Sequence, residues 1–294
     1  MPLDQRPRSP AATWGGDTIR HCYQIATPEI ARAPDVTALQ GDLDDNFALL
    51  SNIGYQGVEL MTIEPRELNW SEIRTLSKKY HLPVVLVCTG EVYGQLGLSF
   101  TDCKGTVRTK AIEKVKAIVE FASYLGANIN IGRVRGLSDD SRPDHSLGLA
   151  LAALREVCAH ASPLGVKVLI EHIERMETNF ITTVAEACHL VDILDLNNFG
   201  IMMDVFAMYH EESDLCATIR KYSPQYNYHV HLSDSDRHYP GHKDIDFDRV
   251  IRAFCEAGFN GAYVEEVLQL PNQEAAARRS FDHVQPILAK YYST

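Results

Sequence analysis

The sequence lacks the features of a membrane, secreted or nucleic-acid-binding protein. No stretch approaches the roughly 20 apolar residues that a membrane-spanning helix needs. The first residues, MPLDQRPRSPAATWGGD, contain proline and arginine but no apolar core, so they do not predict a secretory signal. The net charge of −11 provides no basic footprint for nucleic acid. We therefore expect a soluble protein with neither a membrane nor a nucleic acid as its partner.

Cysteine patterns that would build disulfides or zinc sites are also missing. The seven cysteines are scattered, odd in number and without a C-x-x-C pair. This usage is typical of reduced thiols, so we expect a cytoplasmic protein.

What the chain does have is a repeated alternation of short apolar segments and helical patterns. Eight apolar or β-branched segments, each bounded by Gly, Pro or Asn, predict strands. The patterns between them predict helices that include residues 70–80, 107–125, 147–161, 183–194, 247–256 and 273–288. Such alternation is typical of parallel βα units, and eight units predict an α/β fold, a single (β/α)8 TIM barrel. A doubly wound open sheet is the alternative, but HCYQIATPE has no Gly-rich phosphate turn.

One domain is expected to account for most of the chain. Residues 1–16 predict a mobile N-terminal arm, and residues 17–294 predict the TIM-barrel catalytic domain, because no Gly- or Ser-rich linker divides them. Two long connections, 91–106 and 235–245, follow the third and seventh predicted strands. They lie on the side where barrel active sites are found, so we expect them to wall a pocket.

Four acidic or imidazole side chains recur at near-regular intervals on apolar runs. They are Glu171 in KVLIEHIE, Asp204 in GIMMDVF, His231 in NYHVHLSDS and Glu266 in GAYVEEVL. A buried carboxylate is costly unless it is compensated, and successive strands of a barrel converge on one mouth. One histidine with three carboxylates is a mostly oxygen ligand set that suits Mn²⁺, Mg²⁺ or Co²⁺. The pattern therefore predicts one shared divalent cation.

Alternation along the strands leaves some orientations open. Neighbouring residues point to opposite faces, so only one of Glu265 and Glu266 faces the barrel interior, and the same choice arises at Glu171. His229 shares a face with His231 but lies deeper, which predicts a core histidine.

Arg133 and Arg135 end the fourth predicted strand, in NINIGRVRG. Alternation aims both side chains the same way. If that way is inward, they bind a carboxylate or phosphate of the substrate; if it is outward, they pair with helix acids.

Four segments of the C-terminal half resemble the xylose-isomerase-like TIM-barrel superfamily. They are EHIERMET, MMDVFAMYHEE, HVHLSDSDRHYPG and FNGAYVEEVL. The closest likeness is to the sugar isomerase and epimerase branch, which includes the tagatose and psicose 3-epimerases. The resemblance implies that Glu171, Asp204, His231 and Glu266 bind one divalent cation, with Mn²⁺ foremost, and that Glu171 and Glu266 move the proton. It also implies a homo-oligomer, either a dimer or a tetramer.

The same resemblance implies substrate contacts and shows two departures. Arg237 and Glu177 match positions that touch the sugar. Ala207 stands where the family pattern D-x-x-H places a histidine, and His210 would substitute for it only with a rebuilt loop. Asp244 replaces a second histidine, in PGHKD. These changes count against a free-ketohexose 3-epimerase and leave the metal ligands untouched.

The expected activity is that of a divalent-metal-dependent isomerase or epimerase. It would act on a ketose or a related keto-sugar or cyclitol by proton abstraction next to a carbonyl, through an enediolate. A lyase or dehydratase acting on a keto-sugar, keto-glycoside or inosose would use the same metal site, and Ala207 makes it the main alternative. A DNA-repair AP endonuclease of the same superfamily is a remote alternative, because the earlier strands end without further histidine ligands and the net charge disfavours DNA.

Overall fold

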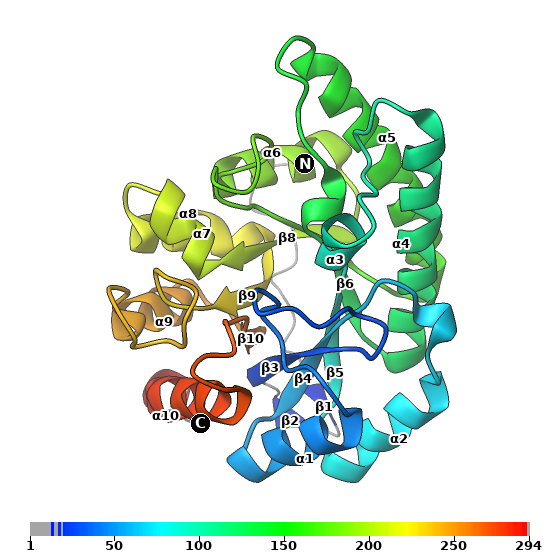
Figure 1. Cartoon of the computed structure of the whole chain (residues 1–294). Coiled ribbons are helices and arrows are strands. Elements are labelled where there is room, and N and C mark those ends of the chain that lie inside the picture. Colours follow the sequence, from blue (N-terminus) through cyan, green and yellow to red (C-terminus); the bar gives the residue numbers. More distant parts are fainter. Residues whose placement is uncertain (1–12, 15–16, 19, 293–294) are drawn as a thin grey trace.

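Eight parallel strands close into a barrel in chain order (Figure 1). The computed structural model describes residues 13–14, 17–18 and 20–292. The barrel strands are β3 (His21–Ala26), β4 (Gly57–Met61), β5 (Val84–Cys88), β6 (Asn128–Ile131), β7 (Val168–Glu171), β8 (Phe199–Asp204), β9 (Asn227–Leu232) and β10 (Ala262–Glu265). The predicted TIM barrel is confirmed, and the doubly wound alternative is wrong.

Helices surround the barrel, as Figure 1 shows. The longer ones are α1 (Leu43–Ile53), α2 (Trp70–Tyr80), α4 (Gly105–Leu125), α5 (Pro143–Ala161), α6 (Val184–Leu194), α8 (Leu215–Tyr226), α9 (Phe247–Glu256) and α10 (Gln273–Tyr292). Short elements complete the described chain: α3 (Gly90–Gly94), α7 (Val205–Glu211), η2 (Pro65–Glu67), η3 (Arg133–Arg135) and η4 (Ser162–Leu164). The predicted helices are present. Their observed ends differ from the predicted ones mainly in the first or last turn, where the residues are polar or exposed and the apolar periodicity gives no signal.

Capping residues explain two of the helix starts. The Asn69 side chain accepts a hydrogen bond from the backbone N–H of Glu72 at 3.2 Å, as the sequence predicts for α2. Thr183 caps α6 through a capping box with Glu186. The predicted helix 183–194 therefore begins one residue later, because its first residue is the cap.

The N-terminal part of the described chain adds one antiparallel pair, β1 (Thr13–Trp14) with β2 (Asp17–Thr18). Most of the arm predicted for residues 1–16 lies outside the described residues, so its mobility stays a prediction. Among the residues that are described, no helix combines the length and apolarity required to cross a bilayer.

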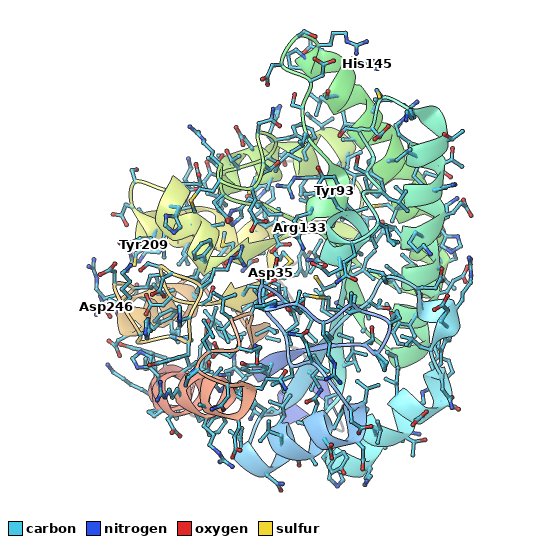
Figure 2. All side chains as sticks on the ribbon, in the orientation of Figure 1. Asp35, Tyr93, Arg133, His145, Tyr209 and Asp246 are labelled. Carbon is cyan, nitrogen blue, oxygen red and sulfur yellow. The ribbon has the colours of Figure 1, made fainter. Side chains whose placement is uncertain are left out.

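The strands are buried along nearly their whole length, because helices cover the outer face and side chains fill the interior. The register sets Asp204 of β8 opposite His231 of β9, and His231 opposite Val264 of β10. The ends of these three strands are therefore level with one another. Figure 2 shows Asp35 and Arg133 near the centre of this view, whereas His145 and Asp246 lie at the periphery.

Candidate active site

Four strand ends bring the predicted ligands together at the mouth of the barrel. Glu171 ends β7, Asp204 ends β8, His231 is the penultimate residue of β9 and Glu266 directly follows β10. His231 Nδ1 lies 3.5 Å from Glu171 Oε1 and 3.5 Å from Glu266 Oε2. All four side chains are buried, so their charges interact with little screening by water.

The orientations that the sequence left open are now resolved. Glu266 faces the mouth, whereas Glu265 Oε1 lies 2.8 Å from His21 Nε2, on the side of the sheet that packs against α10. Glu171 also faces the mouth, and its neighbour His172 instead accepts a hydrogen bond from the backbone of the adjacent strand.

His231 is held between carboxylates on both sides of its ring. Its Nε2 lies 3.1 and 3.0 Å from the two oxygens of Glu59. Its Nδ1 is buried and has no hydrogen-bond partner among the described residues. Glu59 also binds His229 Nε2 at 2.8 Å and accepts a hydrogen bond from Gln24 at 2.7 Å, so the predicted core position of His229 is confirmed. A histidine that binds a metal ion usually donates the N–H of its other ring nitrogen to such a carboxylate, so the contact with Glu59 fits a ligand role for His231 Nδ1.

The electrostatics of the cluster favour a bound cation. Burial raises the pKa of Asp204 to about 8. The nearby Glu266 and Glu171 carboxylates also raise this pKa, whereas Arg237 lowers it. Glu171, His231 and Glu266 each offer a ligand atom, and these three atoms lie within 4.8 Å of one another. Asp204 lies outside that group of three, on the strand next to His231. Three crowded carboxylates and an unpartnered imidazole nitrogen are a donor set that fits a hard divalent cation.

Arg237 spans the carboxylates at the edge of this cluster. Its Nη1 donates to Glu266 Oε2 at 2.8 Å and lies 4.0 Å from Asp204 Oδ2. Its Nη2 lies 3.5 Å from Glu174 and 3.8 Å from Glu177. Burial alone would lower the pKa of Arg237, but the surrounding carboxylates raise it above its ordinary value. The backbone at Arg237 is left-handed, with a φ of 61°, which is strained for a residue with a side chain.

Arg133 and Arg135 do not point the same way, contrary to the expectation from strand alternation. Strand β6 ends at Ile131, and both arginines lie in the 3₁₀ turn η3, where the period of two no longer holds. Arg133 faces the cavity and is paired with Glu91. Arg135 is 1% exposed, and its guanidinium donates to backbone carbonyls, including that of Glu171 at 3.0 Å. Arg135 therefore supports the loops beneath the site and is removed from the candidate substrate contacts.

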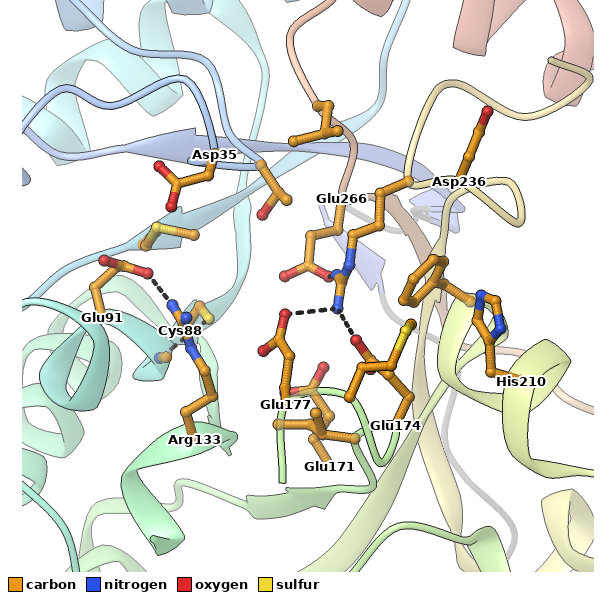
Figure 3. A pocket seen from close by; sticks show the side chains of 18 of the residues that line it. Asp35, Cys88, Glu91, Arg133, Glu171, Glu174, Glu177, His210, Asp236 and Glu266 are labelled. Carbon is orange, nitrogen blue, oxygen red and sulfur yellow. Dashed lines mark hydrogen bonds and ion pairs between the residues drawn. The ribbon is translucent and has the colours of Figure 1, made fainter. Parts of the chain in front are cut away.

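A cavity of about 450 Å³ opens above the ligands (Figure 3). Glu171, Glu177, Arg237 and Glu266 line it, together with Arg133 on the opposite wall. Segment 235–245 contributes three lining residues, Ser235, Asp236 and Arg237, as predicted for the wall of a pocket, whereas segment 91–106 contributes Glu91 alone.

His210 also lines the cavity, from helix α7. Its Nε2 bonds to the backbone carbonyl of Ser235 at 3.1 Å, and its ring packs edge-on against Phe206. Ala207 is fully buried and does not line the cavity. His210 thus reaches the pocket from a position three residues beyond the one where the resemblance expects a histidine.

Comparison with known proteins now identifies the family. Residues 47–287 match the xylose isomerase-like TIM barrel family. The chain belongs to this family.

Several curated proteins that are similar to this chain are named as epimerases. The ketose 3-epimerase of Arthrobacter globiformis is 32% identical over 157 residues, which are 52% of this chain and 54% of that protein. The chain thus spans about half the length of this relative. The D-psicose 3-epimerase of Agrobacterium fabrum is 28% identical over 226 residues, which are 74% of this chain and 76% of that protein.

A solved structure shows the same barrel. The 3-keto-D-glucoside 4-epimerase from E. coli has a TM-score of 0.76 at 20% identity and covers 92% of this chain and 100% of that one. At this level of identity the likeness concerns the fold alone.

The sequence did not predict the supporting role of the residues that hold the ligands in place. Glu59 lies in the apolar run GVELM, and a carboxylate in such a buried strand was the only signal available. Glu174 contacts Arg237, but it was not predicted because it lies between Glu171 and Glu177, the two positions of EHIERMET that the resemblance identifies. Gly132 has no sequence signal: a Cβ added there would lie 2.8 Å from Glu171 Oε2, so any other residue would force this carboxylate to shift.

Proposed function

We propose that the protein is a divalent-metal-dependent sugar epimerase that moves a proton on the carbon next to a carbonyl, through an enediolate. The observation that carries the proposal is the placement of Glu171 and Glu266, each with an oxygen 3.5 Å from His231 Nδ1. The two curated relatives are named as 3-epimerases, which supports epimerisation over aldose–ketose isomerisation.

Glu171, Asp204, His231 and Glu266 would hold one ion, Mn²⁺ in the first place and Mg²⁺ or Co²⁺ as alternatives. When bound, the ion supplies Lewis-acid polarisation of a carbonyl and an adjacent hydroxyl. Glu59 keeps the proton of His231 on Nε2, so that Nδ1 presents its lone pair to the ion.

The two glutamates are arranged to exchange protons with a substrate between them. Asn130 donates to Glu171 Oε2 at 2.9 Å, and Arg237 donates to Glu266 Oε2 at 2.8 Å. Burial raises the pKa of Glu266, but His231 and Arg237 outweigh it and lower that pKa to about 2. Glu266 is therefore deprotonated, which is the form that can accept a proton. One carboxylate removes the proton and the other returns one to the opposite face, which inverts the carbon.

The charges of the cavity support an uncharged sugar as the substrate. Arg133 and Arg237 are the arginines among the described residues that line it. Arg133 is paired with Glu91, and Arg237 is surrounded by Glu266, Glu174 and Glu177. Neither guanidinium is available to bind a phosphate or a carboxylate without breaking an ion pair.

A lyase is the second candidate, favoured by one observation. Ala207 brings no polar group to the place where the family resemblance expects a histidine that holds the sugar near its carbonyl. The same deprotonation followed by loss of a neighbouring substituent would then give elimination in place of epimerisation.

Proton exchange tests the proposal most simply. The metal-free protein would be loaded with Mn²⁺ and incubated in D₂O with a panel of unphosphorylated ketoses and 3-keto sugars. We expect deuterium at the carbon next to the carbonyl and formation of the epimer. Release of water or an aglycone would favour the lyase, and no exchange with any member of the panel would count against both.

A further inference from the structure

A second group of metal-type side chains lies on the loop that follows β9. His242 Nδ1 is 3.0 Å from Asp236 Oδ2, and His238 Nδ1 is 3.3 Å from Asp236 Oδ1. The two imidazole rings are stacked, with centroids 4.4 Å apart and an interplanar angle of 12°. One ligand atom from each of the three residues lies within 4.8 Å of the other two.

The loop backbone holds these side chains in place. The Asp234 carboxylate accepts hydrogen bonds from the backbone N–H groups of Lys243, Asp244 and Ile245 at 2.8, 3.0 and 3.1 Å. The backbone N–H of Asp234 donates to the carbonyl of His238 at 2.9 Å. The two ends of the loop are thus tied to one residue, which restrains the backbone on both sides of His238 and His242.

The group is separate from the cluster around His231. Asp236 stands at the rim of the cavity, and Figure 3 shows its carboxylate directed away from Glu171 and Glu266. Its side chain is 24% exposed, as is that of His238, and that of His242 is 37% exposed. An ion could therefore reach this group from solvent without entering the sugar pocket.

We propose that Asp236, His238 and His242 form a second divalent-cation site, of the class that binds Zn²⁺, Co²⁺ or Ni²⁺. Two imidazoles and one carboxylate are a borderline ligand set that these ions prefer, and water completes the coordination. Ligands about 2.1 Å from a zinc ion lie on the order of 3.4 Å from one another in a tetrahedral arrangement. The 3.0 and 3.3 Å contacts of the two histidines with Asp236 are close to that spacing. To bind an ion through Nδ1, His238 would exchange its 3.1 Å contact with the backbone carbonyl of Asp236 for the ion.

The site has a consequence for the sugar pocket. Arg237 lies between Asp236 and His238 in the chain and has a left-handed backbone. An ion bound to both neighbours restrains the segment that aims the Arg237 guanidinium at Glu266. Occupancy is therefore expected to slow hydrogen exchange of the backbone amides over residues 236–242.

Zinc titration of the full-length, metal-free protein tests the site. We expect two Zn²⁺ ions per chain for the original protein and one for the His238→Ala/His242→Ala variant, with Asp236→Asn weakening the second ion at least about tenfold. His145→Ala is the matched control, because His145 is exposed and belongs to no metal-type group among the described residues. Circular dichroism verifies that each variant is folded.

A further variant separates this site from the proposed catalytic ion. Glu171→Gln/Glu266→Gln removes two ligands of the first cluster and is expected to keep one Zn²⁺ that protects residues 236–242 from exchange. Equal Zn²⁺ stoichiometry in the original protein and the His238→Ala/His242→Ala variant would overturn the proposal and leave the trio as a hydrogen-bonded network only.

Discussion

The two halves of the barrel contribute differently to the mouth. Strands β7 to β10 supply the side chains that face the proposed ion: Glu171, Asp204, His231 and Glu266. Strands β3, β4 and β6 supply polar groups that hold those side chains. Gln24 of β3 and Glu59 of β4 lie behind His231, and Asn130 of β6 bonds to Glu171.

This difference shows that the geometry of the ligands depends on residues that would never touch the ion. Glu59 is fully buried, and burial raises its pKa. His231 and His229 together lower this pKa by more, so it lies below its ordinary value. The carboxylate therefore stays charged and keeps its hold on His231. The ligand half provides the chemistry, and the supporting half fixes where the ligand atoms lie.

The largest expected effect comes from the ligand half. Glu171→Gln and Glu266→Gln should each reduce turnover by about 10³-fold or more, because each removes a proton-transferring carboxylate. Deuterium exchange into the substrate measures the loss. Glu265→Gln, which changes a neighbouring carboxylate that bonds to His21 away from the mouth, is the control and should keep most activity. Undiminished deuterium exchange in either glutamine variant would contradict the two-carboxylate mechanism.

A smaller effect is expected from the supporting half. Glu59→Gln should weaken binding of Mn²⁺ by about 10- to 100-fold, since His231 loses the acceptor that fixes its Nε2–H. Isothermal titration of the metal-free protein gives the affinity directly. The matched control is Glu265→Gln, a buried carboxylate of β10 that bonds to His21 away from the mouth. Equal affinities in the two variants would contradict the supporting role.

The rim of the pocket should affect substrate binding more than chemistry. Arg237→Ala is expected to raise KM about tenfold with a smaller change in kcat, because its guanidinium lines the cavity at the position that the family resemblance places against the sugar. Steady-state kinetics with the best ketose of the panel would show the split. An unchanged KM would remove this contact from the proposed site.

The smallest effect concerns a single methyl group in the supporting half. Gly132→Ala places a Cβ against Glu171 Oε2, so the carboxylate must shift and kcat should fall about fivefold. Gly148→Ala, in α5 with open space around it, should instead stabilise the protein by about 0.5–1 kcal/mol. Equal activities in the two variants would show that Glu171 tolerates displacement.

Much of the fold and the ligand set could be predicted from the sequence. Strand and helix periods predicted the barrel, and spacing together with the family resemblance selected Glu171, Asp204, His231 and Glu266. The error at Arg135 arose because alternation was extended past Ile131, where the strand ends. The predictions of a mobile arm, of a homo-oligomer and of the metal remain predictions.

The supporting residues could not be predicted in the same way. Glu59 acts on His231, which is far away in the sequence, and only closure of the barrel brings the two strands to the same interior. Gly132 matters because it has no side chain, which leaves space for the carboxylate of Glu171. Neither contact produces a local sequence pattern, so the supporting role of the first half of the chain could not be predicted from its sequence.

Mn²⁺ dependence of proton exchange is the most direct test of the account. The protein would be stripped by exhaustive chelation, assayed for deuterium exchange into its substrate, and assayed again after stepwise addition of Mn²⁺. We predict that exchange is lost on chelation and recovers fully at one Mn²⁺ per chain. Undiminished exchange in the stripped protein would contradict the central claim that the four strand-end side chains act through a bound ion.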